Sequence, residues 1–360
     1  MAATAVLYRA SDLRAFATAL LRAASLPPER AAVVAEVLLE GDLLGHTTHG
    51  LDMLARYLRE IADGRMATTV EPVVVNDRDS AFTWDGCYLP GPWLVKRAIA
   101  EARPRLKRHP VVTAVIGRSH HIGCLQAYLE PVAREGLVML ITCSDPAAGG
   151  VTPHGGVAPV LTPNPIAAGF PTDGDPVLID ISTSTTTNAR TRRSHEEGQR
   201  LEGQWLVDDL GRATDDPSVL FGARPGAVLP LGGLDLGHKG FALALLVEAL
   251  TSALAGHGRA DEPKQWGASV FLQIIDPDGF GGSDAFRRET TRLGAICHGA
   301  AVPPGKPGVR LPGEAALSRR FRQMRDGVTL HGSVMPALRP WADKFDVSVP
   351  SALPGADDGA

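Results

Sequence analysis

The sequence lacks the features that mark secreted and membrane-spanning proteins. Its four cysteines, Cys87, Cys124, Cys143 and Cys297, lie far apart and form no CxxC pair, so neither a zinc knuckle nor a disulfide framework is expected. No stretch approaches the roughly 18 uninterrupted apolar residues of a membrane span. The N-terminus lacks the basic start and long apolar core of a signal peptide. We therefore expect a soluble protein of the reducing cytoplasm.

An excess of positive charge is also absent. The 360 residues carry a net charge of −4, from 36 Lys and Arg against 40 Asp and Glu, whereas nucleic acids and anionic membranes require a basic face. We interpret the basic clusters at 103–108 and 190–193 as solvated helix or loop charge. The composition therefore predicts neither a nucleic-acid nor a membrane partner. A chain of this length can form one large domain or two to three smaller ones.

The pattern of apolar residues changes near residue 70. The first 65 residues predict helices, because apolar residues recur there with a helical period. Strand and helix patterns then alternate. Residues 185–235 show little periodicity and predict a long excursion instead of a packed layer. The later elements expected are an apolar helix (239–256), a strand (268–276), a helix (284–299) and a final amphipathic helix (313–327).

The stretch GHTTHG, residues 45–50, follows a strongly apolar helical pattern. Asp42, His46 and His49 are spaced i, i+4, i+7, so an unbroken helix would place them on one face, where they could hold a metal. Glycines bracket the histidines, which disfavours a continuous helix. The pattern leaves three functions open for the imidazoles: metal ligation, acid–base catalysis, or packing and capping.

A second histidine pair lies in RSHHIG, residues 118–123, between a predicted strand and a predicted helix. A turn in this position aims donors and side chains into a crevice, and histidine titrates near neutral pH, so an acid–base role is one interpretation. The alternative is an exposed His120 and a helix-capping His121. A nucleophilic Ser119 is the weakest option, because the sequence has no GxSxG elbow.

Neither a GxGxxG fingerprint nor a P-loop is present. The stretch 232–240 comes close to a P-loop, but His238 precedes Lys239, and Gly240 replaces the required Ser or Thr. What remains is a glycine-rich turn that brings a lysine to the start of a long helix, where free N–H groups favour a phosphate. The alternative is a plain glycine turn before a buried helix. The segment 309–320 offers the same possibility again.

Together these stretches resemble the type-2 malate/L-lactate dehydrogenase family, which also includes ureidoglycolate dehydrogenase, 2,3-diketogulonate reductase and Δ1-piperideine-2-carboxylate reductase. The family pattern Asp-Leu-x-Gly-x-x-Ser-His-Gly corresponds to DLLGHTTHG (42–50), with Thr48 in place of serine. The other correspondences, in order along the chain, are SHHIG (119–123), TPNP (162–165, with one residue inserted), LIDISTS (178–184), Lys239-Gly240 and Pro312-Gly313-Glu314.

The resemblance implies an NAD(P)-dependent oxidoreductase of mixed α+β fold without a Rossmann domain. It implies a helical lobe from both chain ends (1–70 with 315–345), a cofactor-binding domain on a largely antiparallel sheet (71–314) and a tail (346–360), of which we expect the last eleven residues to be frayed. It also implies a homodimer with active sites near the subunit interface. The reaction would interconvert a 2-hydroxy acid and a 2-oxo acid, or reduce a cyclic imine carboxylate, with NAD or NADP.

The resemblance also implies roles for single residues. His49 would be the acid–base residue, oriented by Thr48 and Asp180, and His121 would lie across the substrate and nicotinamide. His46 would pack behind them. Met53, Tyr57 and Thr162 would contact the substrate. Besides His121, the cofactor would be lined by Ser144, Leu178, Ile179, Asp180, Ser182, His238, Lys239, Gly240, Pro312, Gly313 and Glu314.

One position departs from the family pattern. Four residues after the Ser-His histidine, the family commonly has an arginine that pairs with the substrate carboxylate. Here that residue is Met53, and the nearest arginine is Arg56. A thioether cannot replace a bidentate guanidinium, so either another cation binds the carboxylate or the substrate is less acidic.

Two other functions remain open. One is a metal-dependent hydrolase that uses Asp42, His46, His49 and His121. The other is a relative that binds the cofactor without catalysis.

Overall fold

The computed structural model of the protein describes residues 6–353. Its α-helices are α1 (Ala10–Ala23), α2 (Pro28–Leu44), α3 (Leu54–Ala62), α4 (Gly91–Arg105), α5 (Leu129–Arg134), α6 (Asn188–Glu196), α7 (Gly233–Glu248), α8 (Ser283–His298), α9 (Glu314–Asp326) and α10 (Val334–Phe345). Its strands are β1 (Leu7–Tyr8), β2 (Val73–Asp77), β3 (Ala81–Asp85), β4 (Val111–Ser119), β5 (Val138–Ser144), β6 (Ile166–Phe170), β7 (Val177–Ile181), β8 (Leu206–Val207), β9 (Ala213–Thr214), β10 (Ala227–Val228), β11 (Ala268–Ile275) and β12 (Val328–Thr329).

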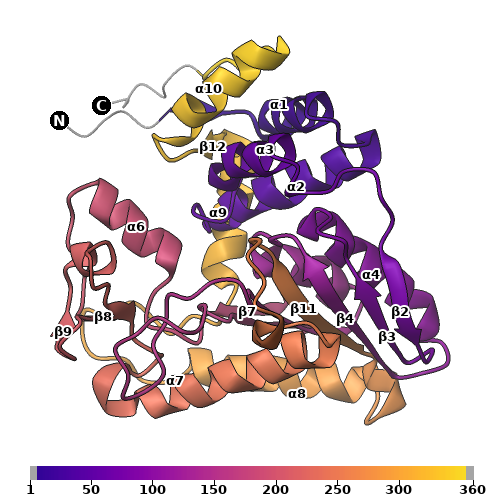
Figure 1. The fold of residues 1–360 in the computed structure, drawn as a ribbon. Coiled ribbons are helices and arrows are strands. Elements are labelled where there is room, and N and C mark those ends of the chain that lie inside the picture. The colour runs from indigo at the N-terminus through magenta and orange to yellow at the C-terminus, as the bar shows by residue number, and fades with distance from the viewer. Residues whose placement is uncertain (1–5, 354–360) are drawn as a thin grey trace, which may run out of the picture.

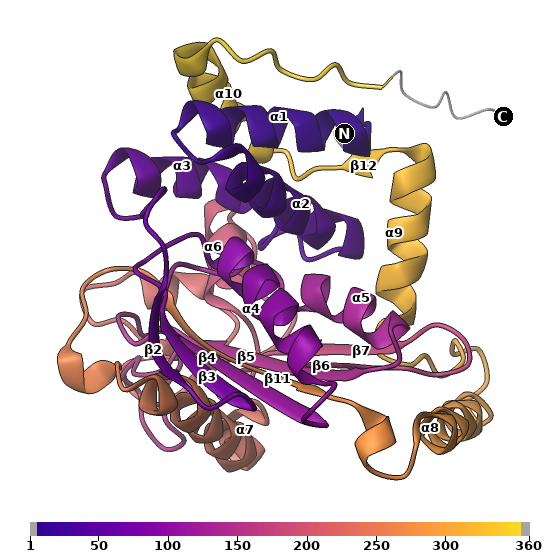
Figure 2. The same cartoon turned by 90° about the vertical axis from the view of Figure 1, so that its right-hand side faces the viewer.

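A seven-stranded sheet in the order β2-β3-β4-β11-β5-β6-β7 forms the centre of the described chain. Within this sheet β3 and β4 pair in parallel and every other neighbouring pair is antiparallel. The prediction of a mixed fold on a largely antiparallel sheet is therefore confirmed. The central strand β11 is apolar along most of its length because both of its faces are covered. Helices α4 and α5 cover one face of the sheet, and α7 and α8 lie on the other (Figure 2).

A layer of helices lies beyond α4 and α5 (Figures 1 and 2). Its buried apolar cluster draws on α1, α2, α3 and α10, that is, on residues 8–66 together with residues 328–342. Strands β1 and β12 also join the two ends of the chain, as a short antiparallel pair. Helix α2 starts with Pro28 in its first turn and is followed directly by Gly45, which has a φ of 96°, a conformation that glycine adopts without steric cost.

Three predictions made from the pattern of residues were wrong. The excursion at 185–235 contains α6 and a three-stranded sheet, β10-β8-β9, with its own small apolar cluster. Helix α7 begins at Gly233, so Lys239 lies in its second turn and not at its N-terminus. The tail is held up to Leu353, whose backbone N–H donates to the carbonyl of Leu7 at 2.8 Å. The remainder of the tail, 354–360, lies outside the described residues.

Two further observations concern the described chain as a whole. No described helix is both long and apolar enough to span a bilayer. All four cysteines are free thiols.

Candidate active site

The loop that carries Thr48 and His49 is fixed at both of its ends. Helix α2 stops at Leu44, so the unbroken helical face considered for Asp42, His46 and His49 does not form. Instead, the buried Asp42 carboxylate accepts the backbone N–H of Leu51 across the loop, at 2.7 Å. A Cβ atom on Gly50 would overlap this carboxylate at 2.4 Å, so glycine is required there.

His49 lies against a group of aromatic side chains from two layers of the fold, and His121 is at the centre of that group. The Thr48 hydroxyl lies 2.9 Å from His49 Nδ1, and the His49 ring stacks on His121, with centroids 5.7 Å apart. The hydroxyl of Tyr57 lies 2.8 Å from His121 Nδ1 and 2.9 Å from the His121 carbonyl. Thr48, His49 and Tyr57 come from the helical layer and His121 from the turn after β4, so the structure brings together four of the predicted residues.

Burial keeps both histidines neutral at physiological pH. Removal from water lowers the pKa of His49 to about 4, with smaller contributions from His46 and Arg193, and burial lowers the pKa of His121 well below its usual value. The backbone N–H of Gly123 donates to His121 Nδ1 at 3.3 Å, so the neutral ring carries its proton on Nε2. His121 is thus a hydrogen-bond donor, and His49 can act as a base.

Sequence reasoning missed Trp266, which packs against this group. Its ring stacks on His121 with centroids 5.0 Å apart, and the guanidinium carbon of Arg56 lies 3.3 Å from its centroid. His120 meets the same indole edge-on and is completely buried, so the alternative of an exposed His120 is excluded. Trp266 lies in the loop before β11, and no motif marks it. Its position follows from the pairing of β11 with β4, a contact between strands distant in sequence.

Helix α6 contacts the histidine loop through Arg193, which was interpreted as solvated charge. Its guanidinium donates to the Thr47 hydroxyl at 2.9 Å and to the Thr47 carbonyl at 3.3 Å, and it pairs with Asp52 at 3.2 Å. That interpretation was wrong for Arg193. The segment 185–235 therefore contributes a side chain, Arg193, that contacts the histidine loop.

Asp180 lies near His46 and does not touch the Thr48–His49 pair in the described structure. Its carboxylate accepts the backbone N–H of Gln126 at 2.9 Å and the Cys124 thiol at 3.7 Å. Gln126 in turn bonds His46 Nε2, at 2.9 Å. Burial raises the pKa of Asp180. Among residues 6–353, no direct contact between Asp180 and His49 therefore supports the expected orienting role of Asp180.

Two of the predicted cofactor segments lie side by side. The Leu178 backbone N–H donates to the Pro312 carbonyl at 2.9 Å, and a Cβ atom on Gly313 would lie 2.9 Å from Leu178 Cβ. Glu314 pairs with His298 at 2.7 Å. Ile179 and Ser182 are half-buried on the same segment as Leu178. The end of β7 and the start of α9 therefore form one surface.

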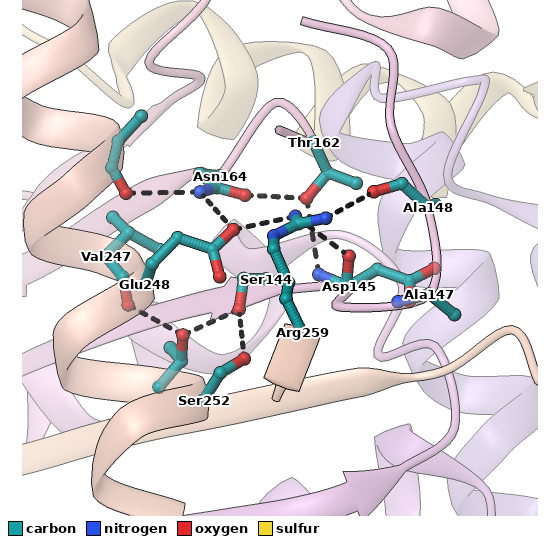
Figure 3. A network of polar contacts seen from close by, with 12 residues as sticks. Ser144, Asp145, Ala147, Ala148, Thr162, Asn164, Val247, Glu248, Ser252 and Arg259 are labelled. Atoms are coloured by element: carbon teal, nitrogen blue, oxygen red, sulfur yellow. Dashed lines mark hydrogen bonds and ion pairs between the residues drawn. The ribbon is translucent and has the colours of Figure 1, made fainter. Parts of the chain in front are cut away.

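Ser144 and Thr162 belong to a polar network that joins the loop after β5 to the end of α7 and the turn that follows it (Figure 3). The Ser144 hydroxyl contacts Thr251 at 2.7 Å and Ser252 at 3.0 Å, and Thr162 donates to the Asn164 side-chain oxygen at 2.6 Å. Arg259, which pairs with Glu248, also donates to the carbonyls of Asp145 and Ala148. The network fixes the loop after β5, and both predicted residues make their contacts within the protein.

The remaining predicted residues lie apart from the histidine group. His238 and Lys239 are exposed on α7, and His238 meets His154 edge-on, with centroids 5.7 Å apart. A Cβ atom on Gly240 would overlap the backbone of Leu231, at 2.4 Å from its nitrogen, so this glycine allows α7 to approach that turn. Met53 is half-buried and packs against the apolar cluster of the helical layer, which is the behaviour of a core-filling thioether.

The quartet considered for a metal hydrolase does not converge. Among residues 6–353, the one group with ligand atoms within 4.8 Å of one another is His46, Cys124 and Asp180, which contains neither Asp42, His49 nor His121. Burial raises the pKa of Cys124 well above its usual value, so a metal bound there would have to displace the proton of this thiol.

Comparison with known proteins gives a consistent result. A family model described as malate/L-lactate dehydrogenase matches residues 8–339. An L-lactate dehydrogenase of Cupriavidus necator is 31% identical over 95% of this chain and 99% of its own. A Δ1-pyrroline-2-carboxylate/Δ1-piperideine-2-carboxylate reductase of Pseudomonas syringae is 32% identical over 88% and 90%. The crystal structure of malate dehydrogenase from Entamoeba histolytica has the same fold, with a TM-score of 0.91 at 21% identity over 96% and 100% of the two chains.

The buried Asp42 makes a prediction about stability. Burial raises its pKa from 3.8 to about 7, so the folded state binds this proton more tightly than the unfolded chain does between those values. The free energy of unfolding therefore falls as pH rises through this window, by roughly 4 kcal/mol at most for this group. Asp42→Asn keeps an acceptor for Leu51 and cannot ionise. Urea unfolding from pH 5 to 8 should show a flatter dependence in this variant.

The matched control is Asp12→Asn, at an exposed position on α1. It should reproduce the wild-type dependence on pH. If the free energy of unfolding depended on pH in the same way in Asp42→Asn and the wild type, the raised pKa of Asp42 would be contradicted.

Proposed function

The chain belongs to the malate/L-lactate dehydrogenase family, and from this premise we propose how its residues carry out the family's chemistry. The match confirms the resemblance seen in the sequence motifs. The protein is an NAD(P)-dependent oxidoreductase that interconverts a 2-hydroxy acid and a 2-oxo acid, or reduces a cyclic imine carboxylate. Relatives named for both kinds of substrate, each more than 30% identical over most of this chain, support this function.

His49 is the residue that moves the substrate proton. The observation that carries this assignment is the neutral, half-buried His49 ring between Thr48 and His121. When the Thr48 hydroxyl accepts from Nδ1–H, the lone pair on Nε2 is free to take the hydroxyl proton of a 2-hydroxy acid during oxidation. During reduction His49 returns that proton. His121, with its proton on Nε2 and its Nδ1 bonded to Tyr57, donates a hydrogen bond to the substrate oxygen.

The cofactor is NAD or NADP, and the residues present fit a dinucleotide. Gly313 packs directly against Leu178, so Leu178 and Pro312–Glu314 form one continuous surface, to which we assign the cofactor. Lys239 is exposed and forms no ion pair within residues 6–353, so its ammonium is available to a phosphate. The nicotinamide supplies the hydride. Asp180 acts through the turn at Gln126 and not on His49 itself.

The fold divides into two functional parts in this proposal. Residues 1–70 and 315–345 form a helical lobe that carries the acid–base residues, and residues 71–314 form a cofactor domain without a Rossmann fold. The two apolar clusters, one in the helical layer and one on the sheet, support the division, and Val37 and Leu317 of the helical lobe pack into the cluster of the sheet. The largely antiparallel strand order also supports it. The four free thiols suit a reducing compartment such as the cytoplasm.

We also propose a homodimer built on α7 and α8. Large apolar side chains on these helices and on the helical turn after α7 remain exposed: Leu245 at 49%, Leu246 at 51%, Leu254 at 54%, Leu293 at 60% and Ile296 at 54%. Both helices lie on the sheet face opposite the helical layer (Figure 2). A second copy that covers this face would remove the apolar side chains from water.

Replacement of the histidines tests the catalytic assignment. His49→Ala and His121→Ala should each lower turnover by roughly 10²- to 10⁴-fold, the usual effect of losing an acid–base group, while the thermal midpoint changes little. His46→Ala, which loses a bond to Gln126, should keep most activity. The measurement is kcat with both reduced cofactors on a panel of 2-oxo acids and cyclic imine carboxylates. A folded His46→Ala protein more damaged than His49→Ala would contradict the assignment.

The pH profile tests the protonation state. Because burial lowers the pKa of His49 to about 4, the ring is already a free base at pH 5. The kcat/KM for oxidation should therefore stay flat from pH 7 to 5 and fall only toward pH 4, where the ring protonates. Pre-steady-state mixing from neutral stock limits acid unfolding. An inflection near pH 6.5 that disappears in a His49 variant would refute the neutral-base assignment.

Disruption of the apolar face tests the homodimer. Leu246→Glu places a charge on that face and should convert the dimer to a monomer in sedimentation equilibrium, because burial of an unpaired carboxylate is costly. Leu210→Glu is the control, since Leu210 is 66% exposed on a different part of the chain. It should leave the mass unchanged. A wild-type monomer, or a dimer unaffected by Leu246→Glu, would contradict this interface.

A further inference from the structure

Three side chains of the kinds that bind metals converge beside the histidine loop. They are His46, which follows α2, Cys124, in the turn after β4, and Asp180, on β7. One ligand atom of each lies within 4.8 Å of the other two, and within residues 6–353 this is the one such group. The three residues are distant in sequence, so the packing of the helical layer on the sheet creates the group.

The separation of sulfur and oxygen already matches a metal site. Cys124 Sγ lies 3.7 Å from Asp180 Oδ2. In tetrahedral zinc coordination, bonds of about 2.3 Å to sulfur and about 2.1 Å to oxygen place these two atoms about 3.6 Å apart. The His46 nitrogen lies within 4.8 Å of both partner atoms, against about 3.4 to 3.6 Å in the same tetrahedron. Movement of the half-buried His46 ring by roughly 1 Å therefore completes three corners of the tetrahedron.

Gln126 prepares His46 for metal binding. The amide NH₂ group of Gln126 donates to the Leu178 carbonyl at 3.0 Å, and the amide oxygen lies 2.9 Å from His46 Nε2. That oxygen can only accept, so a neutral His46 ring carries its proton on Nε2 and its lone pair on Nδ1. Histidines that bind metals commonly donate their other ring N–H to an oxygen in this way. Nδ1 is therefore the atom of His46 that is available to a metal.

The donor set and its charge select the metal. A thiolate, a carboxylate and a neutral imidazole together carry two negative charges, which a divalent cation cancels, so the filled site adds no net charge to a buried place. Sulfur and nitrogen donors suit zinc, whereas magnesium and calcium prefer oxygen. The Cys124 thiol donates to Asp180 and releases its proton to solvent when its sulfur binds the metal. His46 and Asp180 are partly exposed, which gives the ion an approach from solvent.

We propose that His46, Cys124 and Asp180 form a zinc site that fastens the histidine loop to the sheet. His49 lies on the same loop, and its backbone N–H donates to the His46 carbonyl at 2.8 Å. A bound ion therefore connects the segment that carries His49 with the turn after β4 and with β7. Zinc takes no part in hydride transfer. It acts on stability, because a ligand that binds only the folded state raises the thermal midpoint.

The test uses Co²⁺ and Zn²⁺ on the full chain, after treatment with a chelator and with all thiols reduced. The wild type should bind one Co²⁺ ion per chain and show the near-ultraviolet charge-transfer band of a cobalt–thiolate bond, and Zn²⁺ should displace the cobalt and abolish the band. Zn²⁺ should also raise the thermal midpoint of the wild type.

Cys124→Ala is the decisive variant, because it removes the thiol and leaves the other two ligands in place. It should lose the charge-transfer band, and its zinc affinity, measured by competition, should fall by roughly 100-fold or more, since even the loss of a group that only supports a ligand costs about 10- to 100-fold. Zinc should no longer raise its thermal midpoint. His46→Ala and Asp180→Asn keep the thiol and should weaken zinc binding as well, so they carry the test if Cys124→Ala does not fold.

Matched controls come from the other free thiols. Cys87→Ala and Cys297→Ala should keep both the band and the shift in thermal midpoint, and circular dichroism checks the fold of each variant. A wild type without the charge-transfer band would overturn the proposal, as would a folded Cys124→Ala protein that keeps it or a His46→Ala protein that zinc stabilises as much as the wild type. None of these readouts is activity, so the result is independent of the proposed function.

Discussion

The site depends on the contact between Tyr57 and His121. The Tyr57 hydroxyl meets both the Nδ1 atom and the carbonyl of His121, and it joins α3 of the helical layer to the end of β4 in the sheet. Burial raises the pKa of this phenol, so it stays neutral and keeps its single proton for one of these two acceptors. Without this contact, the His121 ring would keep the hydrogen bond from Gly123 of its own turn, but among residues 6–353 none would join it to the helical layer that carries His49.

Low polarity around the histidines has a consequence for charge. Desolvation makes both imidazoles neutral, which suits proton acceptance, and it also makes any unpaired charge expensive. Arg56 bears that cost beside them. The same environment therefore prepares His49 as a base. It also strengthens the attraction of a guanidinium for an anion, because the water that would screen their charges is excluded.

The sequence predicted the parts of the site that lie on local motifs. Thr48-His49 and His121 belong to short, ordered patterns, and the structure places them together. Three features could not be predicted in this way. Trp266 reaches the site through the pairing of β11 with β4, Arg193 through the packing of α6, and the start of α7 lies six residues before Lys239 because glycines there still allow helix. The first two depend on contacts between distant segments, which hydrophobic periodicity does not encode.

The most direct test is a crystal structure of the protein with NADH or NADPH and oxalate. Our account predicts the nicotinamide against the surface formed by Leu178 and Gly313, and one oxalate oxygen within hydrogen-bond distance of His49. A ligand bound away from the Tyr57–His121 contact, with His49 facing neither ligand, would contradict it.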